Sequence, residues 1–377
     1  MNLRNIWAIT RKEFYHLIRD FRSLYLAFAI PLLLIFLFGY ALSLDVDNIE
    51  TVVVDYDRTD ISREFIRHMD ASPYFHIGAQ LGATKEVTKY LDHGWASLAV
   101  VIPPNWAKRL RADREASLQI LLDGSDPNFA SITRGYVNAF VEQYNQKLLA
   151  EFLNRRGMEK IQVPIEGRVR VWFNEDLESR NFIIPGIIAI IIMIVGAMLT
   201  SLVIAREYEN GTMETIKSLP INAGEFLVGK AIPYFFVGMI DVLVSILMGQ
   251  LLFGIVMKSG FWLMIMASSI YLAVALALGL LISSVTKSQL IANQGAILIT
   301  YLPSLLLSNF VFPVINMPKG LQLLTYIVPA TYYIDILNGL YLRNLGLSHL
   351  WPNFLVMIVM LIILAALNCL LLRKEGL

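Results

Sequence analysis

Charged residues are scarce in this sequence of 377 residues. They make up 16% of the chain, against about 25% in soluble domains, while hydrophobic residues make up 56%. This composition excludes an ordinary soluble enzyme and a disordered chain. The formal net charge of +1 lacks the basic excess that phosphate binding requires, so we expect no nucleic-acid partner. Cysteine is nearly absent. Cys369 stands alone, which excludes an intrachain disulfide and a two-cysteine zinc site.

Catalytic patterns are missing as well. The sequence contains no Ser/His/Asp set, no His-Glu-x-x-His motif and no paired-carboxylate site, and its five histidines lack ligand spacing. The segment Gly224–Ala231 approaches a phosphate-binding loop, but Ala231 replaces the hydroxyl residue that binds Mg²⁺ and no strand precedes it. We therefore expect this chain to bind no cofactor or metal, and to contain no ATP site of its own.

Long runs without Asp, Glu, Lys or Arg are the strongest positive signal. A helix needs about 20 apolar residues to cross a bilayer. Six segments meet this requirement, and we predict membrane spans at 24–42, 183–205, 231–257, 261–285, 289–312 and 350–372. The first run is too long for the apolar part of a signal peptide, so we expect it to remain as a membrane helix. No matching halves are visible, which argues against an inverted-repeat transporter.

The distribution of lysine and arginine predicts the orientation. These residues gather before the first span, in 206–230, at 286–288 and after the last span. Because cytoplasmic loops retain Lys and Arg, we expect both termini in the cytoplasm. Four parts follow from this topology: a cytoplasmic amphipathic helix at 1–22, a first span at 23–44, an extracytoplasmic domain at 45–181, and five further spans in 182–377.

The expected outer domain has the pattern of a small α/β fold. Strand-like runs lie at 49–54, 97–102, 118–122 and 169–173, and helical patterns lie between and after them at 62–69, 85–92, 104–113 and 128–155. The run Asp55-x-Asp57-x-x-Asp60 lacks the glycine and the final glutamate of a calcium loop, so we interpret it as a polar turn.

The most informative stretch is 206–219, where the second predicted span ends. Gly211 suits the left-handed geometry that terminates a helix, and Thr212 is a good N-cap for a new one. Glu214 would then lie in the first turn, where the helix dipole favours an acid. Pro220 ends this second helix after about two turns. An ordinary turn between spans is the alternative interpretation.

The same stretch resembles the signature of ABC-2-type transporter permeases, which is matched by Arg206-Glu207-x-Glu209-x-Gly211-Thr212-Met213-Glu214 and by the following Ser218-Leu219-Pro220-Ile221. The N-terminal run Arg11-Lys12-Glu13-Phe14 with Arg19-Asp20, the six spans and the outer domain agree with this resemblance. It is closest to the bacterial branch that carries a large outer domain and is often described as multidrug exporters.

The resemblance implies that transport and ATP binding belong to separate subunits. A coupling helix at 206–219 would dock on a separate ATP-binding cassette subunit, which binds the ATP and Mg²⁺. The segment 1–22 would be a connecting helix that also meets the ATPase. A second permease copy or a paralogue would complete a dimer in the bacterial inner membrane, with a periplasmic membrane-fusion protein as a further candidate partner. We expect the acids Glu207, Glu209 and Glu214 to carry the docking.

Asp241 is an acid near the middle of the third predicted span. A charge there costs about 2.5–3.5 kcal/mol on insertion scales. Three interpretations remain open: a structural hydrogen bond to Asn293, Gln294, Gln250 or Ser245, a place in the substrate path, or coupling to a proton or cation. The candidate substrate path comprises Asp241, Asn293, Gln294, Ser308 and Asn309.

The fifth predicted span contains Pro303, and its charge-free run continues to Pro313 and beyond. We interpret 314–342 as re-entrant or interfacial helices on the outer side, with a plain loop lying on lipid as the alternative.

The fold class is therefore an α-helical polytopic membrane protein with an inserted extracytoplasmic α/β domain. The predicted function is export of a hydrophobic or amphipathic substrate. A membrane receptor with an extracytoplasmic ligand-binding domain is the alternative, and an intramembrane enzyme is disfavoured because the spans contain no catalytic cluster.

Overall fold

The computed structural model describes two compact units of the chain. We call Met1–Ser43 with Val171–Leu377 the helical unit, and Leu44–Arg170 the sheet unit. The described residues are 2–41, 48–112, 114–125, 127–155 and 179–377.

The sheet unit contains four strands in the order β2-β1-β3-β4. The strands are β1 (Ile49–Asp55), β2 (Phe75–Leu81), β3 (Leu98–Ile102) and β4 (Gln119–Leu122). β1 pairs in parallel with β2 and β3, and β4 pairs antiparallel with β3. The helices are α3 (Asp60–Asp70), α4 (Thr84–Asp92), α5 (Trp106–Arg111) and α6 (Pro127–Arg155).

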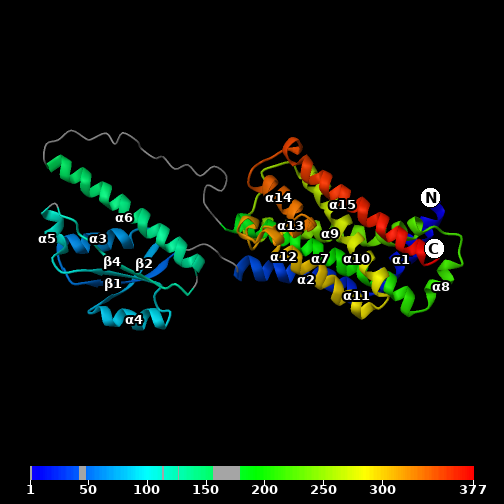
Figure 1. Ribbon diagram of the computed structural model, residues 1–377, viewed down its shortest axis with the longest axis horizontal. Helices are drawn as coiled ribbons and strands as arrows, with labels where there is room; N and C mark the ends of the chain where they lie inside the picture. Colours follow the sequence, from blue (N-terminus) through cyan, green and yellow to red (C-terminus); the bar gives the residue numbers. More distant parts are fainter. Residues whose placement is uncertain (1, 42–47, 113, 126, 156–178) are drawn as a thin grey trace. The chain divides into compact units, whose positions relative to one another are not determined.

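Helices cover both faces of this sheet. Val53 packs in one apolar cluster with Phe65 of α3 and Tyr144 of α6, while Val52 packs in a second cluster with Val87 of α4. Successive side chains of a strand point to opposite faces, so the continuous apolar run of β1 fits a strand that is buried on both sides. Figure 1 shows α3 and α6 on one side of the strands and α4 on the other.

The predicted strands at 49–54, 97–102 and 118–122 are confirmed, as are the four predicted helices of this unit. β2 was not predicted, because it is an edge strand whose exposed positions carry polar residues and whose sequence contains Gly78. The predicted strand at 169–173 lies outside the described residues.

The helical unit is built around α7 (Arg180–Glu209), which is buried along most of its length. Its neighbours include α2 (Phe21–Ala41), α9 (Ala223–Phe253), α10 (Phe261–Thr286) and α14 (Pro329–Tyr341). The remaining elements are α1 (Leu3–Arg19), α8 (Thr212–Lys217), α11 (Gln289–Ala296), the π-helix η1 (Ile297–Tyr301), α12 (Leu302–Leu306), the 3₁₀ turn η2 (Val314–Asn316), α13 (Lys319–Thr325) and α15 (Leu347–Lys374).

Four helices of the described residues are long and apolar enough to cross a membrane, namely α7, α9, α10 and α15. The apolar part of α2 at Phe28–Tyr40 is shorter. The predicted fifth span at 289–312 was too long: its helix changes to a π-helix after Ala296 and ends at Leu306. A charge-free run shows where apolar residues lie, but it does not show where the backbone leaves the helix.

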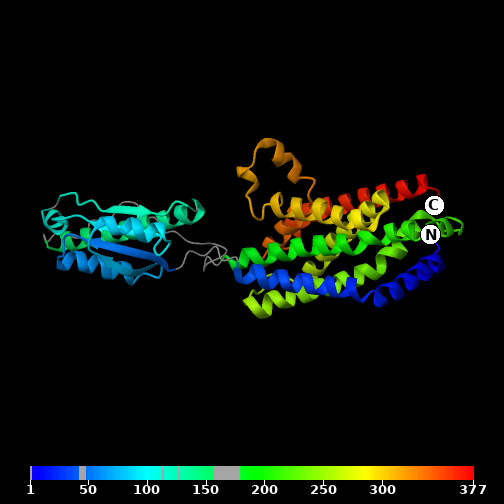
Figure 2. The ribbon, with the colours of Figure 1, turned by 90° about the horizontal axis from the view of Figure 1, so that it is seen from below.

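The segment 314–342 contains two helices with different surroundings. α14 is part of the core, where Tyr333 stacks on Tyr271 with ring centroids 4.1 Å apart and shares a 2.8 Å hydrogen bond with Ser268. The interpretation of the whole segment as a loop lying on lipid is therefore wrong for α14. α13 is more exposed, and Figure 2 shows the segment before α14 standing away from the other helices.

Candidate functional site

The turn between α7 and α8 has the geometry that the sequence predicted at Gly211. Its φ of +71° places it in the left-handed region. Gly211 is itself the N-cap of α8, so the prediction of Thr212 as N-cap was wrong. Thr212 is the first residue of α8, and its hydroxyl donates back to the backbone oxygen and the carboxylate of Glu207. These two bonds tie α8 to the last turn of α7.

α8 is shorter than the predicted coupling helix at 206–219, because Arg206 to Glu209 belong to α7. Met213 and Ile216 are buried, which fixes one face of α8 against the helical unit. Glu214 is exposed on the other side. Leu219, the expected third member of the apolar face, lies beyond α8 and is 51% exposed.

A buried ion cluster joins three helices next to this turn. Lys230 of α9 places its Nζ 2.6 Å from Glu13 Oε2 of α1 and 2.5 Å from Glu207 Oε1 of α7. Tyr234 donates to Glu13 Oε1 over 3.0 Å. We call Glu13, Glu207, Lys230 and Tyr234 the Lys230 cluster. Lys230 is 2% exposed, Glu13 3% and Glu207 7%.

Lys12 completes the charge balance of the Lys230 cluster. Two carboxylates and one ammonium leave one negative charge, and Lys12 brings a second cation 3.0 Å from Glu207 Oε1. A buried ion pair is stable only when its charges are compensated and its remaining hydrogen-bonding capacity is used. The cluster meets this condition, so α1 and the α7–α8 turn are held to α9 at one point.

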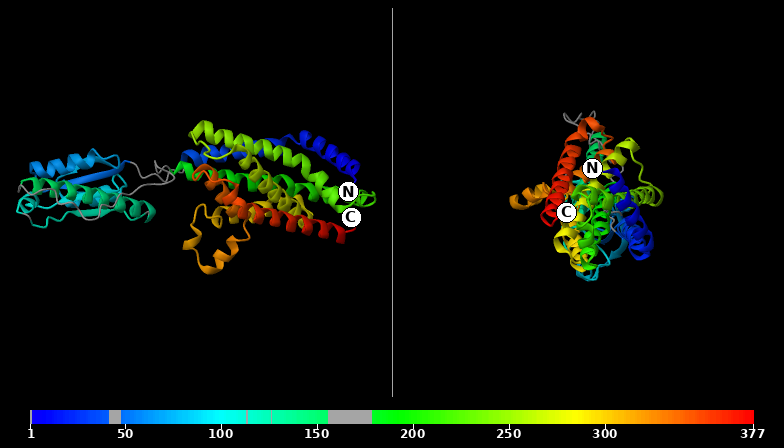
Figure 3. Two further views of the ribbon diagram at one scale, coloured as in Figure 1. Left: turned by 90° about the horizontal axis from the view of Figure 1, so that it is seen from above. Right: turned by 90° about the vertical axis from the view of Figure 1, so that its right-hand side faces the viewer.

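Close packing brings α1 onto α9. A Cβ added at Gly229 would lie 2.8 Å from Ile9 Cβ, so a glycine is needed for this approach. Thr10 donates to Gly229 O over 3.2 Å. Figure 3 shows α1 running beside the other helices at the end that carries both termini. The amphipathic helix predicted at 1–22 is thus present as α1, and its buried face meets protein.

Other contacts around the turn lie within the chain. Arg206 pairs with Asp20 over 2.9 Å, at the end of α1. Glu209 accepts from the backbone nitrogen of Gln289 at 2.8 Å and from its amide at 2.6 Å. The expectation that Glu207 docks directly on an ATPase conflicts with its burial. Glu209 and Glu214 are both exposed, and the carboxylate of Glu209 is held by Gln289.

The structure does not bring the five candidate substrate-path residues together. Asn293 lines a cavity of about 110 Å³ with Asp20, Arg206 and Tyr234. Asp241 is not part of this lining. Its Oδ1 has no hydrogen-bond partner among the described residues, so the predicted bonds to Asn293, Gln294, Gln250 or Ser245 are absent there.

The other three candidates have separate surroundings. Asn309 has a φ of +66° and accepts from Val314 N over 3.0 Å, which is the role of a turn residue. Ser308 is fully buried and its hydroxyl has no partner among the described residues. Gln294 is exposed.

Two segments whose sequences approach ligand-binding motifs have a structural role instead. The segment Gly224–Ala231 lies inside the helix α9 and forms no phosphate-binding loop, and its lysine is held by two carboxylates. Asp55 accepts from two backbone nitrogens and from Ser62, and Asp57 accepts from Thr59 and Ala107. These aspartates stabilise a strand-to-helix turn, as predicted.

Sequence reasoning missed the partnership of Glu13, Lys230 and Tyr234. The available signal was an isolated lysine at the start of an apolar helix, which must find a counter-ion when buried. The sequence alone did not show which acid would supply it.

Comparison with known proteins identifies the family. Residues 21–370 match the model of the ABC-2 family transporter protein. The chain belongs to the ABC-2 family. It is 36% identical over 346 residues to the probable multidrug ABC transporter permease YbhS of Escherichia coli, covering 91% of this chain and 90% of that protein. It is 30% identical over 355 residues to the probable multidrug ABC transporter permease YbhR of Escherichia coli, covering 94% of both chains.

A more distant relative is ABC transporter G family member 20 of Dictyostelium discoideum. It is 21% identical over 371 residues, which cover 98% of this ABC-2 family chain but 50% of that protein. ABC-2 permeases work with an ATP-binding subunit and have no ATP site of their own. The resemblance read from 206–221 is therefore confirmed at the level of the family.

Proposed function

We propose that this chain is the membrane subunit of an ATP-driven exporter of hydrophobic or amphipathic molecules. The observation that carries this proposal is the Lys230 cluster. It connects α1, the end of α7 before α8, and α9 in one buried network. A force applied to α1 or α8 would therefore reach two long membrane helices without passing through a flexible loop.

The surface beside the Lys230 cluster suits a docking partner. A groove of about 330 Å³ lies between α1 and α8, and its lining includes Ile9, Lys12, Ile216, Leu219 and Lys230. Both termini and α8 lie at the same end of the helical unit (Figure 1). We assign this end to the cytoplasm and Glu214 to contact with the ATPase, which would bind ATP and Mg²⁺.

Further parts of the proposal concern the assembly. Six spans in the bacterial inner membrane, with both termini in the cytoplasm, would place residues 45–181 outside. A second permease copy or a paralogue would form the other half of the path, and a membrane-fusion protein is a candidate outer partner. The cavity next to Asn293 is the proposed start of the substrate path, because Asp20 and Arg206 give it polar groups beside an apolar wall.

A charge reversal tests the docking surface. We expect Glu214→Lys to lower substrate-stimulated ATP hydrolysis by at least fivefold in the complex purified with its ATPase and reconstituted in vesicles. Glu115→Lys changes the net charge equally on an exposed position of the sheet unit and should leave hydrolysis unchanged. Stimulation at the control level in Glu214→Lys would refute the docking role of α8.

A further inference from the structure

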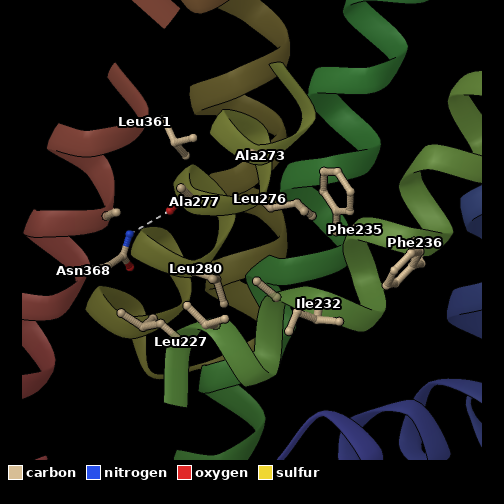
Figure 4. A pocket seen from close by; sticks show the side chains of 13 residues that line it. Leu227, Ile232, Phe235, Phe236, Ala273, Leu276, Ala277, Leu280, Leu361 and Asn368 are labelled. Carbon is tan, nitrogen blue, oxygen red and sulfur yellow. Dashed lines mark hydrogen bonds between the residues drawn. The ribbon is translucent and has the colours of Figure 1, made fainter. Parts of the chain in front are cut away.

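Two large grooves of this chain have walls that differ in charge. The groove between α9, α10 and α15 has a volume of about 480 Å³, and its wall consists of apolar side chains and Asn368 (Figure 4). No charged residue of that wall selects a ligand. The other groove belongs to the sheet unit, lies between α3, α5 and α6, and has a volume of about 490 Å³. We call it the α6 groove. Its wall carries charges, and its volume is typical of small-molecule sites.

An aromatic cluster fixes the three helices that surround the α6 groove. The ring centroid of Phe65 in α3 lies 5.5 Å from that of Trp106 in α5 and 5.0 Å from that of Tyr144 in α6. All three side chains are buried. Trp106 Nε1 also donates to Ala116 O over 3.2 Å, which holds the chain that follows α5. The backbone around the α6 groove is therefore held in place by packing, as in the pre-formed sites that bind small molecules.

Four charged side chains line the α6 groove, and two of them neutralise each other. Lys147 Nζ donates to Glu64 Oε1 over 3.0 Å, and this bond lowers the pKa of Glu64. The pair therefore contributes no net charge. Arg111 and Arg114 are exposed, and their guanidinium groups form no ion pair or hydrogen bond with the residues that the structure describes. The groove thus keeps two positive charges that lack a counter-ion in this part of the chain.

The rest of the wall decides what kind of anion fits the α6 groove. A guanidinium group presents paired N–H donors that match the two oxygens of a carboxylate. An inorganic anion would leave the apolar wall in water, and an uncharged molecule would leave both guanidinium groups unused. The occupant that uses both parts is an amphiphile with an anionic head. The apolar wall consists of Ile61, Leu110, Tyr144, Leu148, Leu149 and Phe152.

We propose that the α6 groove binds a single-chain amphiphile with a carboxylate head, such as a long-chain fatty acid. The carboxylate would lie on Arg111 and Arg114, and the hydrocarbon chain would lie against Leu148, Leu149 and Phe152. The site belongs to the sheet unit alone, so the inference does not depend on the export proposed above.

Photo-crosslinking of the full chain in phosphatidylcholine nanodiscs tests the chemistry of the head group. The probe is dodecanoic acid with a diazirine in its chain, and the readout is adduct on peptides of α5 and α6 by mass spectrometry. The experiment is done at about pH 9, above the ordinary pKa of a carboxyl group. We expect unlabelled dodecanoate to compete at least tenfold better than dodecanamide, which has the same chain but no charge. Equal competition by the two compounds would overturn the anionic head.

Matched double variants test the two arginines. Lys108 and Arg109 are exposed on α5 and do not line the α6 groove. We expect Arg111→Gln with Arg114→Gln to weaken the competition by dodecanoate at least tenfold. Lys108→Gln with Arg109→Gln removes the same charge from the same helix and should leave the competition unchanged. Equal competition in the two double variants would overturn the role of Arg111 and Arg114.

A second matched pair tests the place of the hydrocarbon chain. Leu149 lines the α6 groove and is 52% exposed, while the adjacent Ala150 is also exposed on α6 but does not line it. Leu149→Asp puts an acid where the chain would lie, so we expect it to reduce the adduct at least tenfold. Ala150→Asp adds the same charge and should leave the adduct unchanged. Equal adduct in both variants would overturn the location of the site.

Discussion

Replacing Lys230 with methionine removes the cation that lies between Glu13 and Glu207. Breaking a buried ion pair by deleting one partner costs about 3–5 kcal/mol, because an uncompensated charge remains in the interior. Lys230→Met leaves two buried carboxylates without their shared cation, since the Nζ of Lys230 lies within 2.6 Å of both. We therefore expect the free energy of opening the contact between α1 and α9 to fall by about 3–5 kcal/mol.

The opening is measured with a cysteine at Ile6, which is 8% exposed on the buried face of α1. The variant Ile6→Cys is made in a Cys369→Ser background, and its reaction with a water-soluble maleimide is followed over time. If α1 opens and closes faster than it is labelled, the rate follows the opening equilibrium. A change of about 3–5 kcal/mol then accelerates labelling by roughly two to three and a half orders of magnitude.

Lys12 supplies the control, because it pairs with the same Glu207 Oε1 but its side chain is 46% exposed. Because the Lys12 ammonium is exposed, water can solvate the charge that its removal leaves on that side of Glu207. Exposed ion pairs contribute about 0–1 kcal/mol, so Lys12→Met should accelerate labelling at most about fivefold. Equal labelling rates in Lys230→Met and Lys12→Met would show that burial does not determine the strength of this cluster. The reasoning about the coupling network would then be refuted.

Two further predictions concern the packing of the helical unit. A Cβ at Gly279 would lie 2.1 Å from Thr200 Oγ1 and 2.3 Å from Ala197 O, so Gly279→Ala should lower the thermal unfolding midpoint, measured by size-exclusion chromatography after heating. Gly320→Ala, which meets nothing within 4 Å, should leave it unchanged, and equal midpoints would contradict the packing argument. Asp241→Asn replaces a buried carboxyl group whose Oδ1 has no hydrogen-bond partner in the described part of the chain, so the midpoint should stay the same or rise. A clear fall would indicate a partner for Asp241.

Local signals in the chain explain why parts of the site were predictable. Gly211 ends α7 in the left-handed region because glycine has no Cβ to clash there. The buried strands β1 and β3 carry continuous apolar runs that stand out in the sequence, whereas the edge strand β2 alternates with polar residues and does not. Thr212 shows the limit of such reasoning, because its side chain bonds backward to Glu207 and not forward as an N-cap.

The sequence by itself determined that this chain is a helical membrane protein of the ABC-2 type. Two signals carried this conclusion, namely the apolar runs long enough to cross a bilayer and the local signature. Both depend on residues that are neighbours in the chain. The tertiary structure decided the partners of the charges. Glu13 and Lys230 are 217 positions apart, and their contact depends on which helices pack together and which faces they turn inward.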